Sequence, residues 1–199
     1  MNVLSKLTKE YLGFEEGERD EDKIYGVERH SFKDISGKLH ERGYYIPSGD
    51  KEILRKLIDK LIERRGDECD LNDIDVSNIE NMQCLFSRLD NFNCDISKWN
   101  VSRVNNMSYM FFGAKSFNQP INNWNVSRVV SMSTMFSCAY SFNQPLDKWD
   151  VSNVLDMSDM FSNAKSFNQS LDKWDVASTT YTLNMFNRCP CKKPKWYIH

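Results

Sequence analysis

Apolar and polar positions along most of this chain repeat with a period of 25 residues. Residues 96–102 return with small changes as 121–127, 146–152 and 171–177. Self-similarity at a fixed period predicts units that stack on one another. The recurring residues are Trp99, Trp124, Trp149 and Trp174; Met107, Met132 and Met157; the Met-Phe pairs that begin at Met110, Met135, Met160 and Met185; and the Phe-Asn pairs that begin at Phe92, Phe117, Phe142 and Phe167.

Within one unit the apolar residues lie mostly three apart, with one two-residue step from Trp149 to Val151. That step predicts a short strand, since alternate strand residues share a side, and residues 157–164 predict a short helix or 3₁₀ turn. The L-x-x-W-x-V order matches the inward residues of leucine-rich repeats. The pattern favours an α/β fold, namely a leucine-rich-repeat-like solenoid of about five 25-residue rungs over residues 69–190.

Both ends of the repeat region differ from its middle. Residues 50–66 carry apolar side chains at helical spacing between a plausible N-cap, Asp50, and a stop, Gly66. We therefore predict an N-terminal capping helix within residues 46–68, a repeat region over 69–190 and a C-terminal cap and tail over 191–199. Residues 1–45 are interpreted as an acidic, partly ordered arm or linker, with six acidic residues among the eight at positions 15–22.

Two columns of equivalent residues should make contacts between units. Each asparagine of the Phe-Asn pairs follows an inward phenylalanine, and the four should form an amide ladder that satisfies backbone groups. Cys69 and Cys94 are one period apart, so their Cα atoms should lie about 5 Å apart, within disulfide reach. The asparagines are Asn93, Asn118, Asn143 and Asn168.

Composition and charge limit the partners and locations that we expect for this chain. The formal net charge of -2 gives no electrostatic reason to expect nucleic acid as a partner. No run of apolar residues is long enough to cross a membrane. The start of the chain, residues 1–14, lacks a secretory signal, and the first cysteine comes only at Cys69, so the chain as written is expected to be cytoplasmic.

Candidate chemistry is sparse. His30, His40 and His199 lie outside the repeats, with no nucleophile and orienting acid beside them, so we expect no enzyme and no catalytic residue. Cys189 and Cys191 could supply two thiolates to zinc, but no further pair completes four ligands, so no metal or cofactor is expected. A small amphipathic docking helix formed by Val3, Leu4, Leu7, Tyr11 and Leu12 is an alternative use of the arm.

Residues 51–195 closely resemble the BspA-like leucine-rich-repeat surface proteins, in the 25-residue type also seen in mycoplasma surface lipoproteins. The resemblance rests on units such as F-N-Q-P-L-D-K-W-D-V-S at 142–152, on residues 69–77, and on Met185, Phe186, Cys189 and Pro190. It implies a non-enzymatic, adhesin-like protein that is displayed on a surface and binds a protein ligand. A structural role in a virion or surface layer is the alternative, and with it a cell-surface or virion location.

If the Trp-x-Val segments are strands, the residues that flank the inward side chains point outward and form the candidate partner surface. Such a face measures roughly 300 Å², below the roughly 800 Å² per partner of a stable interface. Binding is then weak, or flanking loops, the arm or self-association enlarge the surface. The candidate partner-binding residues are Lys98, Asn100, Asn123, Asn125, Lys148, Asp150, Lys173 and Asp175.

Overall fold

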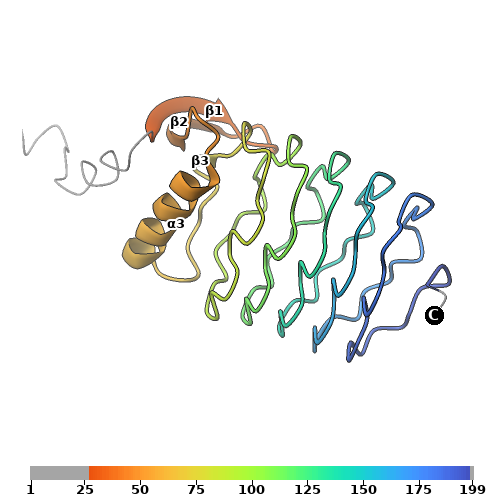
Figure 1. Cartoon of the computed structure of the whole chain (residues 1–199). Coiled ribbons are helices and arrows are strands. Elements are labelled where there is room, and N and C mark those ends of the chain that lie inside the picture. The colour runs from red at the N-terminus through yellow and green to blue at the C-terminus, as the bar shows by residue number, and fades with distance from the viewer. Residues whose placement is uncertain (1–26, 198–199) are drawn as a thin grey trace, which may run out of the picture.

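The computed structural model describes residues 27–197. A hairpin of β1 (Glu28–Lys33) and β2 (Leu39–Tyr45) leads into the helix α3 (Lys51–Arg65), followed by the two-residue strand β3 (Ile74–Asp75). β2 pairs antiparallel with β1 and parallel with β3, which gives a three-stranded sheet in the order β1-β2-β3. These elements lie at one end of the molecule, and the 25-residue units extend from them towards the C-terminus (Figure 1).

The predicted fold class, an α/β leucine-rich-repeat-like solenoid with strands at the tryptophans, is wrong. Over residues 27–197 the regular structure consists of one helix and one three-stranded sheet, and residues 76–197 are turns and irregular chain with isolated bridges. The Trp-x-Val segments contain no strand, and residues 157–164 form turns rather than a helix.

Consecutive β-turns explain the three-residue spacing of the apolar residues. The amide of Trp149 donates to the Leu146 carbonyl, and that of Val154 donates to the Val151 carbonyl. The same i to i+3 bond joins Met157 to Met160 and is the defining contact of a β-turn. The apolar side chains therefore mark successive corners of a folded path, and the chain does not extend between Trp149 and Val151.

Neighbouring units are joined by backbone hydrogen bonds between residues about one period apart. In the turn segment, four amides of each unit donate to four carbonyls of the next, in every one of four successive junctions. At the last junction the donors are Met157, Asp159, Phe161 and Asn163, and the acceptors are Tyr181, Leu183, Met185 and Asn187 at 2.8 to 2.9 Å.

Side-chain columns run through the same units. Each indole Nε1 donates to a carbonyl of the preceding unit, from Trp99 to Leu71 through to Trp196 and Leu171. Phe111 and Phe136 stack at 5.4 Å between ring centroids, and the tryptophans from Trp99 to Trp174 are almost fully buried. The predicted asparagine ladder is confirmed, because the amides of Asn118, Asn143 and Asn168 each donate to the asparagine Oδ1 one unit earlier.

Two positions in each unit adopt left-handed backbone, where residues other than glycine are strained by about 1 to 2 kcal/mol. One of the ten positions is Gly113 at φ 69°, which takes this conformation without steric cost. The nine others are Cys84, Arg88, Tyr109, Thr134, Cys138, Asp159, Asn163, Asn184 and Arg188. The bonds between units must offset this strain.

The predicted helix and its ends are confirmed. The Asp50 side chain accepts from the amides of Glu52 and Ile53, and Gly66 ends the helix at φ 87°. Leu54, Leu57, Ile58 and Leu61 are buried. The helix also bonds to the first repeat unit. Lys51 Nζ and Arg55 Nη1 donate to the Gln83 and Leu85 carbonyls at 3.1 and 2.8 Å. The helix thus occupies carbonyls that a preceding unit would otherwise bind.

We expect Trp149→Ala to lower the free energy of unfolding by about 3 to 5 kcal/mol, as a large-to-small change in a packed interior. Trp149→Phe should cost less, because it keeps most of the buried area and loses only the indole bond to Ile121. Chemical denaturation followed by circular dichroism measures both. Lys148→Ala, at the exposed neighbouring position, is the control, and an unchanged midpoint for Trp149→Ala would contradict the burial.

Removing the cationic contact of α3 should also destabilise the chain. Arg55→Met keeps the aliphatic stem but deletes the bond to the Leu85 carbonyl, which should cost about 1.5 to 3 kcal/mol as a hydrogen bond to a charged donor. It also deletes the exposed ion pair with Asp59, which should add about 0.3 to 0.5 kcal/mol. The same denaturation experiment tests it against Lys56→Met, an exposed residue one position along the helix. Equal midpoints for the two variants would show that the helix packs without capping the carbonyls.

Candidate binding surface

The eight predicted partner residues lie mostly on the surface. Lys98 is half-buried and the other seven are exposed. Four of them also serve the local backbone, since a side-chain oxygen accepts from the amide two residues later. These four are Asn100, Asn125, Asp150 and Asp175.

Two of the predicted lysines are engaged with neighbouring units. Lys148 Nζ donates to Asn123 Oδ1 at 3.0 Å, and Lys173 Nζ lies 3.5 Å from Asp147 Oδ2. The predicted residues therefore form columns across successive units, but the columns follow from turns and not from the strand alternation on which the prediction was based. That they bind a partner stays a prediction.

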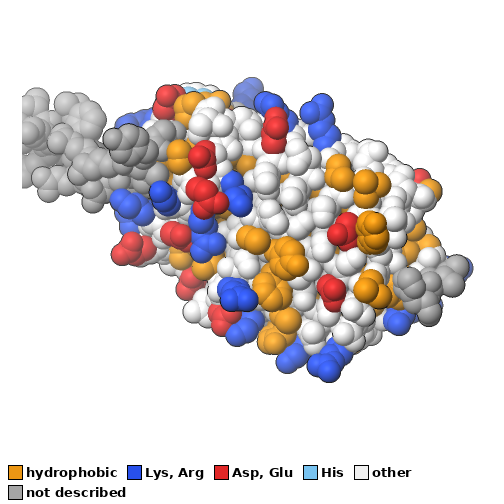
Figure 2. All heavy atoms as spheres, in the orientation of Figure 1, with side chains coloured by type: hydrophobic (Ala, Val, Ile, Leu, Met, Phe, Trp, Pro, Cys, Tyr) orange, Lys and Arg blue, Asp and Glu red, His pale blue; other side chains and the backbone are white. Residues whose placement is uncertain are grey.

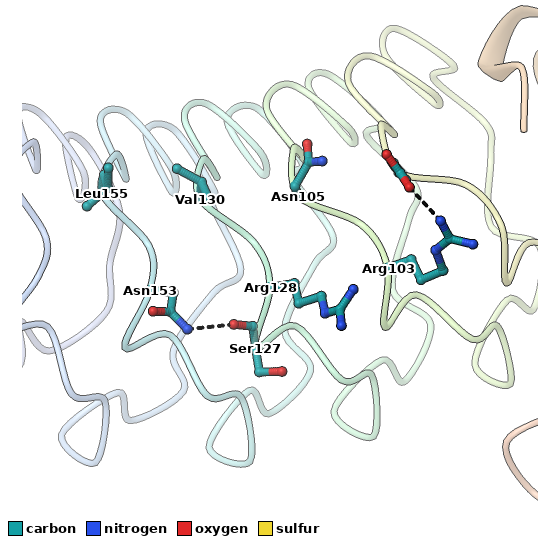
Figure 3. Close-up of a pocket in the computed structure, with 8 residues that line it drawn as sticks. Arg103, Asn105, Ser127, Arg128, Val130, Asn153 and Leu155 are labelled. Carbon is teal, nitrogen blue, oxygen red and sulfur yellow. Dashed lines mark hydrogen bonds and ion pairs between the residues drawn. The ribbon is translucent and has the colours of Figure 1, made fainter.

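A groove of about 490 Å³ lies across several units at positions that the sequence analysis did not select. Figure 3 shows Asn105, Val130 and Leu155 in one row, each from a different unit, with Arg103, Arg128 and Asn153 in a second row. The strand-based reading missed it because Val130 and Leu155 follow the inward valines at a turn. The apolar residues at 130 and 155, where earlier units have Asn105 and Glu80, were the available signal. Ser127 and Glu80 complete the lining.

The groove combines apolar, amide and cationic groups. Val130 and Leu155 are 43% and 44% exposed, unusually high for large apolar side chains in this molecule. Arg103 is paired with Glu80 at 2.6 Å, and Asn153 Nδ2 donates to the Ser127 carbonyl. Arg128 is exposed and makes no ion pair or side-chain hydrogen bond within residues 27–197. Its guanidinium is free to bind a carboxylate.

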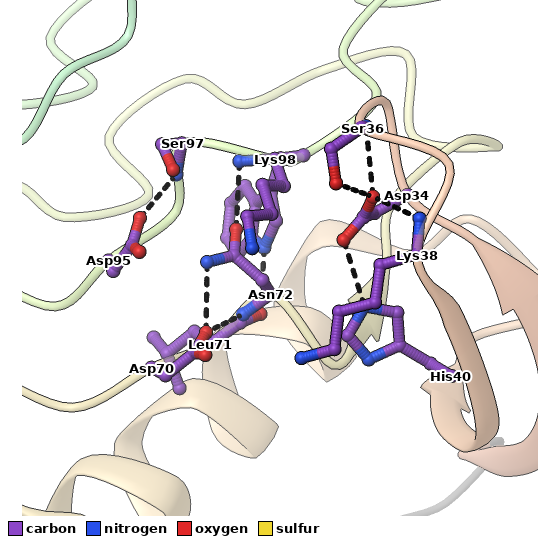
Figure 4. Close-up of polar contacts among 11 residues, drawn as sticks. Asp34, Ser36, Lys38, His40, Asp70, Leu71, Asn72, Asp95, Ser97 and Lys98 are labelled. Atoms are coloured by element: carbon purple, nitrogen blue, oxygen red, sulfur yellow. Dashed lines mark hydrogen bonds and ion pairs between the residues drawn. The ribbon is translucent and has the colours of Figure 1, made fainter.

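A second polar cluster joins the hairpin to the first units (Figure 4). Asp34, at the end of β1, accepts from Ser36 and from the Lys38 amide and lies 3.0 Å from His40 Nε2. Burial alone would raise the pKa of Asp34, but these hydrogen bonds outweigh it and hold the pKa at about 2. The Ile35 amide donates to the Lys98 carbonyl, which ties the hairpin to the second unit.

The histidines of this region have structural partners. His30 Nε2 lies 2.8 Å from Asp75 Oδ2, and its ring stacks on Tyr45.

Asn72, which is buried, accepts from the Lys98 amide and donates to Asp70. Lys98 also lines a smaller hollow of about 140 Å³ between the hairpin and the first units. These contacts fix the hairpin on the first units.

The cysteines form two close pairs. Cys69 Sγ and Cys94 Sγ lie 2.8 Å apart, which confirms the predicted contact between adjacent units, and Cys189 Sγ and Cys191 Sγ are equally close. All are free thiols. The hydrogen bond with Cys94 lowers the pKa of Cys69, while the same bond and burial raise the pKa of Cys94. Of the two thiols, Cys69 therefore loses its proton more readily.

Within residues 27–197, no group of three or more His, Cys, Asp or Glu side chains is arranged to hold a metal ion. The same part of the chain contains no helix of the length and hydropathy needed to span a bilayer. On the face in Figure 2, basic and acidic side chains intermingle around α3 and the hairpin, while the units carry mainly uncharged surface with hydrophobic groups between. The docking helix considered for residues 3–12 lies outside the described part of the chain.

The tandem 25-residue units, joined by repeated backbone bonds and crossed by an open groove, define a repeat protein with an accessible surface. The chain belongs to the family DUF285, described as "Mycoplasma protein of unknown function", which matches residues 58–152 and again 122–195. The two overlapping matches cover the second half of α3 and the repeat units. Searches of curated proteins and of solved structures found no match. The mycoplasma part of the predicted resemblance is thereby confirmed.

Mild oxidation should link Cys69 to Cys94. Diamide, which takes up two electrons and two protons as the disulfide forms, should give a Cys69–Cys94 crosslink detectable by peptide mass mapping, with Cys84 remaining alkylatable because no thiol lies beside it. The crosslink should raise the free energy of unfolding by about 3 kcal/mol, as expected for a closed loop of this size. Cys69→Ser is the control, and a mapped protein with both thiols intact would contradict the contact.

Proposed function

We propose that this chain is a non-enzymatic protein-binding module whose groove holds an extended peptide segment with acidic and apolar side chains. The observation that carries the proposal is the unpaired Arg128 beside the exposed Val130 and Leu155. A guanidinium binds carboxylates in a bidentate manner, and exposed aliphatic side chains gain free energy when a ligand covers them.

The shape of the groove supports a peptide as ligand. Its volume is within the range of binding pockets, about 300 to 1,000 Å³. The groove runs across successive units, so it matches a ligand whose groups recur at regular spacing. The amides of Asn105 and Asn153 border the apolar row and carry both donors and acceptors. A peptide backbone offers the complementary groups at regular spacing.

The resemblance to BspA-like surface proteins supports the finer form of this proposal, an adhesin-like ligand-binding role at a cell surface. The family match itself carries no function. A second candidate, a structural component of a larger assembly such as a surface layer or virion, is favoured by the exposed C-terminal end of the repeat units, where Tyr181 and Leu183 are 61% and 67% exposed.

The proposal is tested with labelled peptides of alternating Glu and Leu, alongside matched peptides that carry Gln in place of Glu. The acidic peptide should bind, and its fluorescence anisotropy titration should show Arg128→Gln weakening the affinity by about tenfold or more, the value of a charge-assisted bond. Leu155→Ser should weaken it less. NMR shifts at the Val130 methyl groups would place the peptide in the groove.

The matched comparison is the triple variant Lys148→Gln, Asp150→Asn and Lys173→Gln, which neutralises the surface predicted from sequence. Asn stands at the position of Asp150 in two earlier units, so the local turn should survive. Loss of binding in the triple variant with full binding by Arg128→Gln would move the site to that surface. Equal binding of the acidic and Gln peptides would contradict a role for Arg128.

A further inference from the structure

The two ends of the repeat units are unlike in their hydrogen bonding. At each junction the amides of one turn segment donate forward to carbonyls of the next unit. At the N-terminal end, Lys51 and Arg55 fill two carbonyls that have no preceding unit. At the C-terminal end the groups are reversed, because the last turn segment has amides for which no following unit supplies carbonyls.

Three amides of the last unit have no backbone acceptor within residues 27–197. The equivalent amides of the unit before, those of Asp159, Phe161 and Asn163, all donate forward. Tyr181 and Leu183, in the same unit, are the most exposed large hydrophobic residues of the described chain. Amides that lack a backbone acceptor among the described residues, beside exposed apolar side chains, invite pairing with another chain segment. The donors are Asn184 and Arg188, which are exposed, and Phe186, which is buried.

The same end is basic. Lys192, Lys193 and Lys195 are exposed, as is Arg188. They are held there because the final segment folds onto the last unit, where Trp196 stacks on Trp174 and Tyr197 packs edge-on against Phe186 at 4.9 Å. A suitable occupant therefore brings carbonyl groups and negative charge.

This chain contains a segment of that chemistry, since six of the eight residues at positions 15–22 are acidic. We propose that the C-terminal end of the repeat units binds this acidic segment of a second copy, so that copies associate head to tail. The segment's carboxylates face Lys192, Lys193 and Lys195, and its backbone carbonyls accept from the exposed amides of Asn184 and Arg188. Leu183 and Tyr181 are covered in the contact.

Distance favours a second copy over the same molecule. Residue 22 lies five positions before Val27, so it can reach at most about 17 Å from it. Val27 precedes β1, whose sheet includes β3 of the first unit, while the open end lies at the opposite side of the units (Figure 1). Four unit steps at about 5.5 Å, the spacing of the stacked phenylalanines, give about 22 Å. Glu21 and Asp22 therefore cannot reach the C-terminal end of their own molecule, whereas a second copy can place all six acidic residues there.

Other pairings of two copies satisfy these groups less well. Two C-terminal ends placed together would oppose donors with donors and lysines with lysines. The N-terminal end of a second copy presents α3, and two carbonyls beneath it are already bonded. The head-to-tail contact is heterologous, and such contacts build open chains unless they close into a ring.

The test uses the full chain in sedimentation velocity over a range of protein concentrations. We expect concentration-dependent oligomers in low salt and their loss when salt rises from about 0.05 M to about 0.5 M, because exposed charges are screened. Lys192→Glu, Lys193→Glu and Lys195→Glu together should weaken association by about tenfold or more. The matched control reverses three exposed lysines at the other end of the molecule, Lys33, Lys38 and Lys56.

A charge swap makes the test specific. A chain with Lys in place of Glu15, Glu16 and Glu18 should fail to self-associate, yet it should form hetero-oligomers when mixed with the triple Glu variant. A labelled peptide of residues 12–25 should bind the full chain and lose about tenfold in affinity to the triple Glu variant. A chain that stays monomeric in low salt, or oligomers that survive the triple reversal, would overturn the proposal. Arg128→Gln should leave self-association unchanged, which separates this result from the peptide groove.

Discussion

Backbone hydrogen bonding between units is the constraint on which this structure depends. Four amides per turn segment have their acceptors only in the next unit, and buried amides without acceptors are costly. These bonds also offset the backbone strain of the left-handed residues, such as Thr134 at φ 60°. A single unit has neither its acceptors nor its core, because the rings of Trp149 and Phe136 are buried by residues of adjacent units.

The sequence predicted the features that depend on identical residues at identical spacing. The asparagine ladder and the Cys69–Cys94 contact follow directly from the period, and the helix follows from Asp50, Gly66 and the apolar face between them. The strands at Trp149 and Val151 were wrong because a two-residue step within a three-residue rhythm also fits consecutive β-turns. Apolar spacing records which side chains are buried, and it does not by itself record how the backbone connects them.

The hairpin and the groove escaped prediction for different reasons. β1 and β2 are mostly polar and only partly buried, and they are held by specific contacts such as His30 with Asp75 rather than by an alternating apolar face. The groove consists of residues at variable positions of the unit, where Val130 and Leu155 replace the polar residues of earlier copies. A sequence period identifies the positions that recur in every unit, whereas the groove is lined by positions that vary between units.

The uniform junctions have a consequence for how such a chain can change over generations. Because each turn segment offers the same donors and receives the same carbonyls, removing or duplicating one whole unit between equivalent positions leaves every remaining junction chemically complete. The hairpin with α3 at one end and Trp196 at the other would still meet the partners they meet now. Recombination between near-identical copies can therefore lengthen or shorten the molecule in steps of 25 residues, and with each step it moves the two ends apart or together without redesigning either.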